Sequence, residues 1–230
     1  MQKDREAFGL GRLTTRPGKK VSQNISSTGL HKLGLDQQRD GLIYIPPAYT
    51  ADKPAALAVM LHGAGGNAEH GISLIKHLAD EANIILLAPI SRSVSWDIIR
   101  HDRFGDDIAF INLALAKTFD TYNINPLRLA IGGFSDGASY ALSMGLTNGD
   151  LFSHIIAFSP GFYYTAQSNG KPPVYISHGT SDNILPINSC SRRIVPRLQK
   201  QGYKVVYDEF DGPHTIPFYI SLKAVEWFLK

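Results

Sequence analysis

Cysteine is the residue that this chain uses least, occurring once in 230 residues, as Cys190. A single cysteine excludes an internal disulfide. A catalytic thiol is also disfavoured, because no histidine and no glycine-rich turn flanks Cys190. We therefore expect Cys190 to be a structural residue.

Long apolar runs and metal-binding spacings are missing as well. No run approaches the roughly 20 apolar residues that span a bilayer, and residues 1–6 lack the apolar core of a secretory signal. We expect a cytoplasmic protein without stable membrane insertion. The chain has no His-x-x-x-His and no Cys/His cluster, and the neighbouring Asp106 and Asp107 point to different sides of a helix. We accordingly expect no metal and no cofactor.

The net charge of +3 is unevenly distributed. Residues 1–20 carry six Lys/Arg and two Asp/Glu, so the rest of the chain sums to −1. A nearly neutral body argues against a polyanionic substrate, and we expect no nucleic-acid partner. We interpret residues 1–27 as a polar, basic arm that is solvated and mobile, although contact with anionic lipid or nucleic acid is an alternative. Residues 28–230 have a suitable length for one α/β domain.

Apolar runs alternate with helical patterns along that domain. Runs that read as strands, several of them buried on both faces, cover residues 30–35, 42–45, 55–61, 84–88, 127–132, 155–158, 174–176 and 204–210. Helical periodicity covers 67–81, a long stretch from 106, the residues after 137, 188–201 and 216–229. This alternation predicts a mainly parallel, doubly wound sheet with helices on both faces and no separate lid domain.

The most informative stretch is Gly133-Phe134-Ser135-Asp136-Gly137, between a predicted strand and a predicted helix. Gly-x-Ser-x-Gly in that setting indicates a nucleophile elbow, although the pattern also occurs by chance in glycine-rich chains. The glycines leave room for a strained turn that exposes Ser135 at the carboxyl edge of the sheet. The amide of Asp136 then lies at a helix N-terminus, where it can donate to an oxyanion.

A second glycine-rich turn, His62-Gly63-Ala64-Gly65-Gly66, follows the strand over residues 55–61. Small residues allow a backbone amide to face the cleft, and the amide of Ala64 is the most natural second oxyanion donor. A phosphate-binding loop is the alternative, but the lysine and Ser/Thr of a P-loop are absent. We expect His62 to support this turn.

Two further strand ends supply an acid and a base. Asp182 follows the strand over 174–176, and His214 follows the last strand. A serine hydroxyl is a poor nucleophile at neutral pH, so His214 must take its proton while Asp182 fixes the imidazole tautomer. Asp208 and Asp211 compete for the role of the acid, but they lie too near His214 and on the wrong strand.

The chain order Ser135, Asp182, His214 is that of α/β-hydrolases. With the turns at 62–66, 133–139, 178–182 and 212–214, the chain from Arg39 onward resembles bacterial serine esterases of the α/β-hydrolase superfamily. It is most similar to the phospholipase/carboxylesterase branch, and also to polyhydroxybutyrate depolymerase-like esterases. The resemblance implies an α/β-hydrolase fold, carboxylic ester substrates, these three residues as catalytic triad, and Ala64 and Asp136 as oxyanion donors.

One position departs from that pattern, because many members have Gln or Met where this chain has Asp136. A carboxylate pointing into the cleft would repel an anionic acyl group. A first-turn acid that faces the helix dipole is the alternative. His178 is expected to support the loop that carries Asp182.

Aromatic residues follow two other strand ends and predict the border of a substrate pocket: Trp96, Phe162 and Tyr163. Such walls suit an uncharged acyl or alkyl group, although Trp96 could instead cap the neighbouring helix. The expected function is a serine carboxylesterase that hydrolyses uncharged short- to medium-chain esters through an acyl-enzyme. A thioesterase, a lysophospholipase, a peptidase of the same fold and a ligand-binding protein that retains the fold are the alternatives, and the oligomeric state stays open.

Overall fold

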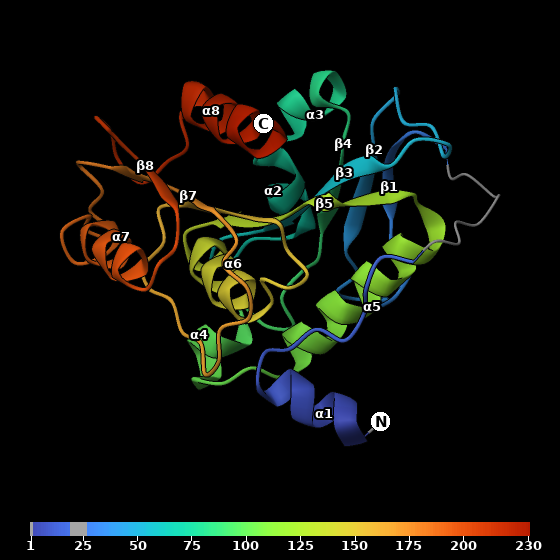
Figure 1. The fold of residues 1–230 in the computed structure, drawn as a ribbon, viewed down its shortest axis with the longest axis horizontal. Coiled ribbons are helices and arrows are strands. Elements are labelled where there is room, and N and C mark those ends of the chain that lie inside the picture. The colour runs from blue at the N-terminus through green and yellow to red at the C-terminus, as the bar shows by residue number, and fades with distance from the viewer. Residues whose placement is uncertain (1, 19–26) are drawn as a thin grey trace.

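A computed structural model describes residues 2–18 and 27–230, and in this part of the chain eight strands form one sheet (Figure 1). Their order is β1-β2-β4-β3-β5-β6-β7-β8. The first two pairs are antiparallel and the other neighbours are parallel, which confirms the predicted sheet. The strands are β1 Gly29–Lys32, β2 Leu42–Ile45, β3 Ala55–Leu61, β4 Ile84–Ala88, β5 Ile124–Phe134, β6 His154–Phe158, β7 Val174–Gly179 and β8 Val205–Phe210.

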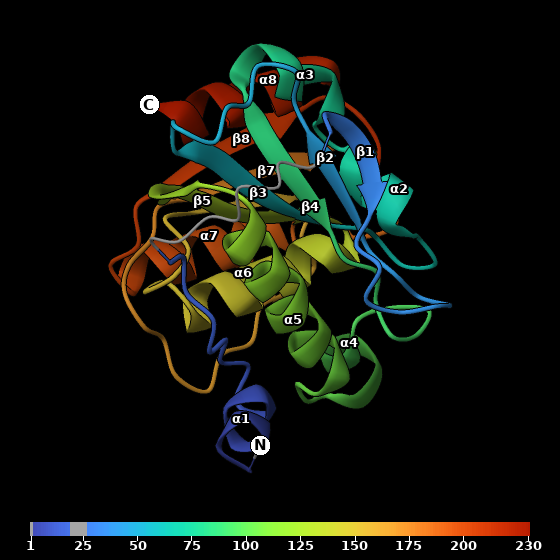
Figure 2. The same ribbon diagram turned by 90° about the vertical axis from the view of Figure 1, so that its right-hand side faces the viewer.

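Helices cover both faces of the sheet, as Figures 1 and 2 show. One face carries α2 Ala68–Ser73, α3 Lys76–Ala82 and α8 Phe218–Leu229. The other carries α4 Asp97–His101, α5 Asp106–Thr121, α6 Asp136–Thr147 and α7 Ser191–Lys200, and α1 Gln2–Gly9 contacts α5 from outside. The strands β3 and β4 therefore lie between two apolar layers along their whole length, which explains their continuous apolar sequences.

The helix expected over residues 67–81 is divided into α2 and α3. Asn67 caps α2 as its sequence suggests, because its Oδ1 accepts a hydrogen bond from the amide of His70 at 3.0 Å. Ile75 then leaves the helical region at φ −139° and ψ 8°, and its side chain is buried. The turn at Ile75 keeps Ile72 and Leu78 in the same apolar layer although the helix axis changes.

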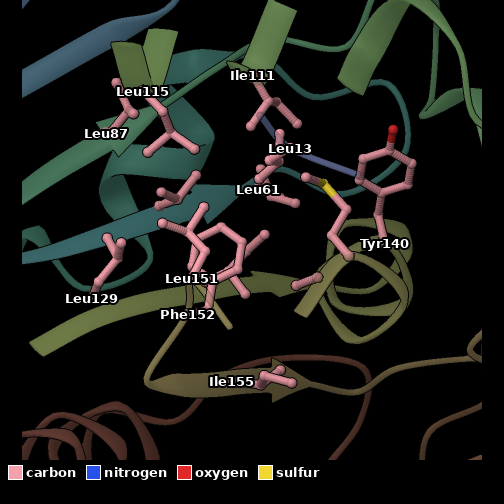
Figure 3. Packing of buried hydrophobic residues seen from close by; sticks show 14 of the residues in the cluster. Leu13, Leu61, Leu87, Ile111, Leu115, Leu129, Tyr140, Leu151, Phe152 and Ile155 are labelled. Atoms are coloured by element: carbon pink, nitrogen blue, oxygen red, sulfur yellow. The ribbon is translucent and has the colours of Figure 1, made fainter. Parts of the chain in front are cut away.

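The N-terminal segment, residues 2–18, packs on the helical face instead of extending into solvent. Leu13 is 1% exposed and lies in the core with Leu61 and Ile111 (Figure 3). Its amide donates to Oδ1 of Asn148 at 2.8 Å, and Nδ2 of the same Asn148 donates to the carbonyl of Gly11 at 2.7 Å.

Two arginines of this segment bind one carboxylate of the domain. Arg12 and Arg16 lie 2.7 and 2.6 Å from Asp150, and their hydrogen bonds hold the pKa of Asp150 well below its usual range. The expectation of a mobile, solvated arm is therefore wrong for this segment. The local sequence pattern could not predict its packing, because the partners Asn148 and Asp150 lie far away in sequence. The predicted boundary between residues 27 and 28 does not separate this segment from the core, and residues 19–26 of the predicted arm lie outside the described residues.

Candidate active site

Ser135 occupies a strained turn between β5 and α6. Its backbone has φ 58° and ψ −121°, a conformation that side-chain-bearing residues rarely adopt. The flanking glycines are required by space: a Cβ at Gly137 would lie 2.2 Å from the carbonyl oxygen of Leu61, and one at Gly133 would lie 2.5 Å from the backbone of Gly137. The amide of Ser135 donates to the carbonyl of Phe158 on β6 at 3.0 Å, which holds the turn at the sheet edge.

Asp182 and His214 meet at the same edge. Asp182 follows β7 and is 5% exposed, and His214 follows β8, with Nδ1 2.5 Å from Oδ2 of Asp182. The amides of Ile184 and Leu185 donate to the other carboxylate oxygen at 2.9 and 2.8 Å. Burial opposes the charge of Asp182, but the Leu185 amide and the His214 imidazole outweigh it, so the pKa of Asp182 is lowered.

This contact orients the imidazole of His214. Because Nδ1 donates its proton to Asp182, Nε2 is left as the basic nitrogen. Nε2 is buried and has no hydrogen-bond partner among the described residues. The ring packs against Phe134, the residue before Ser135, with centroids 4.6 Å apart. His214 and Ser135 are thus neighbours at the sheet edge, although within residues 2–18 and 27–230 no hydrogen bond joins the two side chains.

A second imidazole, that of His178, supports the carboxylate. His178 is fully buried, and its Nε2–H donates to the carbonyl of Leu185 at 2.7 Å while lying 3.2 Å from Oδ2 of Asp182. Its Nδ1 accepts from the hydroxyl of Ser191 at 2.7 Å. Burial lowers the pKa of His178, which favours the neutral ring that this arrangement needs. The position agrees with the support expected from the sequence.

The turn after β3 lies directly beside Ser135. A Cβ at Gly63 would be 3.4 Å from Cβ of Ser135. His62 is a buried ring whose Nε2 accepts from the amide of Ser91 at 3.0 Å and whose Nδ1–H donates to the carbonyl of Gly63 at 2.7 Å. In the described part of the chain, the amides of Ala64 and Asp136 have no assigned acceptor, so both can serve a ligand.

Ser95 is a residue whose position the sequence did not reveal. It is 4% exposed, and its hydroxyl donates to Oδ2 of Asp136 at 2.5 Å. The carboxylate after Ser135 is therefore bound by the segment that follows β4. The only sequence signal was the location of Ser95 after a strand end, which does not specify a partner.

The predicted aromatic border needs correction. Trp96 is fully buried, its Nε1 donates to the carbonyl of His62 at 2.9 Å, and its ring stacks on Tyr140 at 5.0 Å. Trp96 as a pocket wall is wrong, because it has no accessible surface. Tyr163 is also wrong as a pocket wall, because it is only 9% exposed: its hydroxyl donates to Gln201, and Arg197 of α7 covers its ring. Phe162 is 39% exposed and stays a prediction.

Asp97, the residue after Trp96, and Asp107 form a pair of buried carboxylates. Tyr140 donates to Oδ1 of Asp97 at 2.9 Å, and Asp107 accepts from the amides of Arg92 and Asp97 at 2.5 and 2.6 Å. Burial, and next the charge of Asp97, raise the pKa of Asp107 to about 7. His, Cys, Asp and Glu side chains of the described residues nowhere form a group of three that could hold a metal ion.

Comparison with known proteins identifies the family. A sequence model described as phospholipase/carboxylesterase matches residues 102–230, more than half of the chain. The chain belongs to this family. It is a hydrolase of the α/β-hydrolase serine type, as the order of its motifs predicted. In the part of the chain that the structure describes, no helix is long and apolar enough to cross a membrane.

Two of the relatives found carry the names of an esterase and a thioesterase. The chain is 27% identical over 205 residues to the probable feruloyl esterase C of Aspergillus oryzae, covering 80% of this chain and 73% of the relative. It is 26% identical over 132 residues to the acyl-protein thioesterase 1 of Neurospora crassa, covering 53% and 52%.

Two solved structures show the same fold. Esterase PE8 superposes with a TM-score of 0.66 at 23% identity, covering 81% of this chain and 96% of that one. A ferulic acid esterase of Anaeromyces mucronatus gives 0.65 at 16% identity, covering 95% and 96%. The predicted α/β-hydrolase fold is confirmed.

Proposed function

We propose that this protein is a serine carboxylesterase that hydrolyses uncharged short- to medium-chain carboxylic esters through an acyl-enzyme. The observation that carries the proposal is the 2.5 Å contact between His214 and Asp182, beside the strained turn that presents Ser135. A nucleophile, a base and an orienting acid are the minimal set for acyl transfer by serine. Here they come from the ends of three parallel strands.

In the acylation step, Nε2 of His214 takes the proton of the Ser135 hydroxyl as its oxygen attacks the ester carbonyl carbon. Asp182 holds the imidazole in the required tautomer and stabilises the imidazolium. The imidazolium then gives its proton to the leaving alcohol as the carbon–oxygen bond breaks. In deacylation, His214 activates a water molecule, which releases the acid and restores Ser135.

The oxyanion that forms in both steps would be held by the amides of Ala64 and Asp136. Loss of one such donor typically costs about 3 kcal/mol of transition-state stabilisation. Two contacts support these donors: His62 holds the carbonyl of Gly63, and Ser95 holds the carboxylate of Asp136.

Thioester hydrolysis is the second candidate, and the similarity to an acyl-protein thioesterase favours it. Comparing matched oxygen and sulfur esters of one acyl group separates the two activities. The feruloyl esterase relatives make an ester of a hydroxycinnamic acid a useful aromatic member of the same panel. The cytoplasmic location and the lack of a cofactor stay predictions.

The decisive experiment replaces the nucleophile. Ser135→Ala should abolish both hydrolysis of p-nitrophenyl esters and labelling by a fluorophosphonate probe, because the variant lacks the hydroxyl that attacks the ester carbonyl. Ser189→Ala, at an exposed position outside the site, is the matched control and should keep both. Labelling or turnover that survives in the Ser135 variant would overturn the proposal, and neither labelling nor turnover in the unaltered protein would favour a ligand-binding protein.

A further inference from the structure

A cavity of about 440 Å³ adjoins the proposed base on the α3/α8 side of the sheet. Its walls include Phe134 and His214 from the site, and Leu74, His77, Ile216 and Phe218 from the ends of α2, α3 and α8. Cavities of several hundred cubic ångströms with mainly apolar walls are typical of small-molecule sites. Its volume is sufficient for a phenyl-sized group.

The cavity borders the imidazole of His214 and the side chain of Phe134. Phe134 and His214 pack on each other at 4.6 Å and both line it, whereas Ser135, Ala64 and Asp136 do not. In the tetrahedral intermediate the oxyanion points toward those two amides, and the leaving oxygen must lie within reach of Nε2 of His214. The cavity lies beside the ring of His214 that must reach this oxygen, so a group on the leaving oxygen that extends past the imidazole enters it.

The chemistry of the walls specifies an uncharged group. No Lys, Arg, Asp or Glu lines the cavity, and Phe134, Leu74, Ile216 and Phe218 present apolar surface. The wall that joins α3 to α8 is ordered: Nε2 of His77 donates to the hydroxyl of Ser221 at 3.0 Å, and Ser221 donates to the carbonyl of Phe218 at 2.8 Å. The rings of His77 and Phe218 lie 5.2 Å apart. Phe218 is nevertheless 62% exposed, so a bound group could still bury much of its ring.

We propose that this cavity binds the alcohol portion of the ester, an uncharged aromatic or branched alkyl group, and that Leu74 and Phe218 determine which alcohols are accepted. The inference rests on the serine esterase function proposed above. Leu74 and Phe218, which line the cavity, thus take the role that the sequence predicted for the buried Trp96 and Tyr163.

The test uses acetate esters that differ only in the alcohol. Leu74→Trp reduces the space, so kcat/KM for benzyl acetate should fall about tenfold or more relative to methyl acetate, since hydrophobic pockets discriminate on that scale. Phe218→Ala, at a position that is 62% exposed, should also lower the preference for the benzyl ester. Leu127→Trp is the matched control and should leave the ratio unchanged, because Leu127 is 77% exposed and lies near the start of β5, at the other end of the strand from Phe134.

The deacylation rate identifies which half of the ester the cavity holds. All acetate esters give the same acetyl-enzyme, so the variants should leave the deacylation rate unchanged when it is measured after a rapid burst. A changed deacylation rate, or a preference that follows acyl length, would assign the cavity to the acyl group and overturn the inference. An unchanged alcohol preference in both variants would also overturn it. Fluorophosphonate labelling of Ser135 in every variant separates this failure from failure of the proposed function.

Discussion

Two regions of the molecule are each held in place by a few side chains. One is the sheet edge that carries Ser135, Asp182 and His214, and the other is the N-terminal segment of residues 2–18. Only the first is recognisable in the sequence. At the sheet edge each motif acts locally: glycines permit the turn, and the functional side chain stands within it. The N-terminal segment has no such local pattern, because Leu13 and Arg12 depend on Asn148 and Asp150, more than 130 positions away. The local turns at the sheet edge determine the chemistry of the site, and the long-range contacts of the N-terminal segment contribute stability.

The largest effect should come from the acid of the proposed triad. Asp182→Asn should lower kcat by about 10³- to 10⁴-fold, because the amide no longer enforces the tautomer that leaves Nε2 of His214 basic. Folding should be retained, since the substitution keeps the volume of the side chain. Steady-state kinetics and a thermal melt measure the two quantities. An active Asp182→Asn enzyme would mean that His178 or another group orients the base.

The N-terminal segment should show the reverse behaviour. Leu13→Ala should lower the free energy of unfolding by about 3 kcal/mol, because it leaves a cavity in the core beside Leu61 and Ile111. The kcat of the folded enzyme should be unchanged. Leu10→Ala is the control, since Leu10 is 54% exposed and its loss should cost less than about 0.5 kcal/mol. Urea unfolding measures both, and equal effects of the two variants would contradict the buried role of Leu13.

The smallest effect concerns the carboxylate pair between the two regions. The raised pKa of Asp107, about 7, means that the folded state binds its proton more tightly than the unfolded chain does. Between about pH 4 and pH 7 the folded state therefore holds more protons, and stability falls as the pH rises through that range. From pH 5 to pH 8 this group should remove about 1 to 3 kcal/mol.

Asp107→Asn isolates that contribution. The variant loses an acceptor for the amide of Asp97 and should be less stable at every pH. Its free energy of unfolding should nevertheless vary less between pH 5 and pH 8 than that of the unaltered protein. Parallel pH dependences in urea unfolding would show that Asp107 titrates near its usual pKa.

Much of the fold was predictable because its strands are buried on both faces and its helices are amphipathic. The runs over β3, β4 and β6 correspond closely to observed strands. The errors occurred where a long-range contact decides the outcome. The location of Trp96 after a strand end suggested that its side chain is exposed. In the structure it is buried, stacked on Tyr140 and hydrogen-bonded to the carbonyl of His62. The helix over 67–81 divides at Ile75 because burial of that side chain prevails over local periodicity.

By itself the sequence determined the family, the alternation of strands and helices within the sheet and the three residues proposed for catalysis, because the turns at these positions require particular residue types. It did not predict the helices α1 and α4. The tertiary structure decided which groups support the three residues. Ser95 binds Asp136, His178 lies beside Asp182, and a cavity opens next to His214. These are contacts between residues distant in sequence, and only packing of the chain on the sheet brings such residues within hydrogen-bond distance.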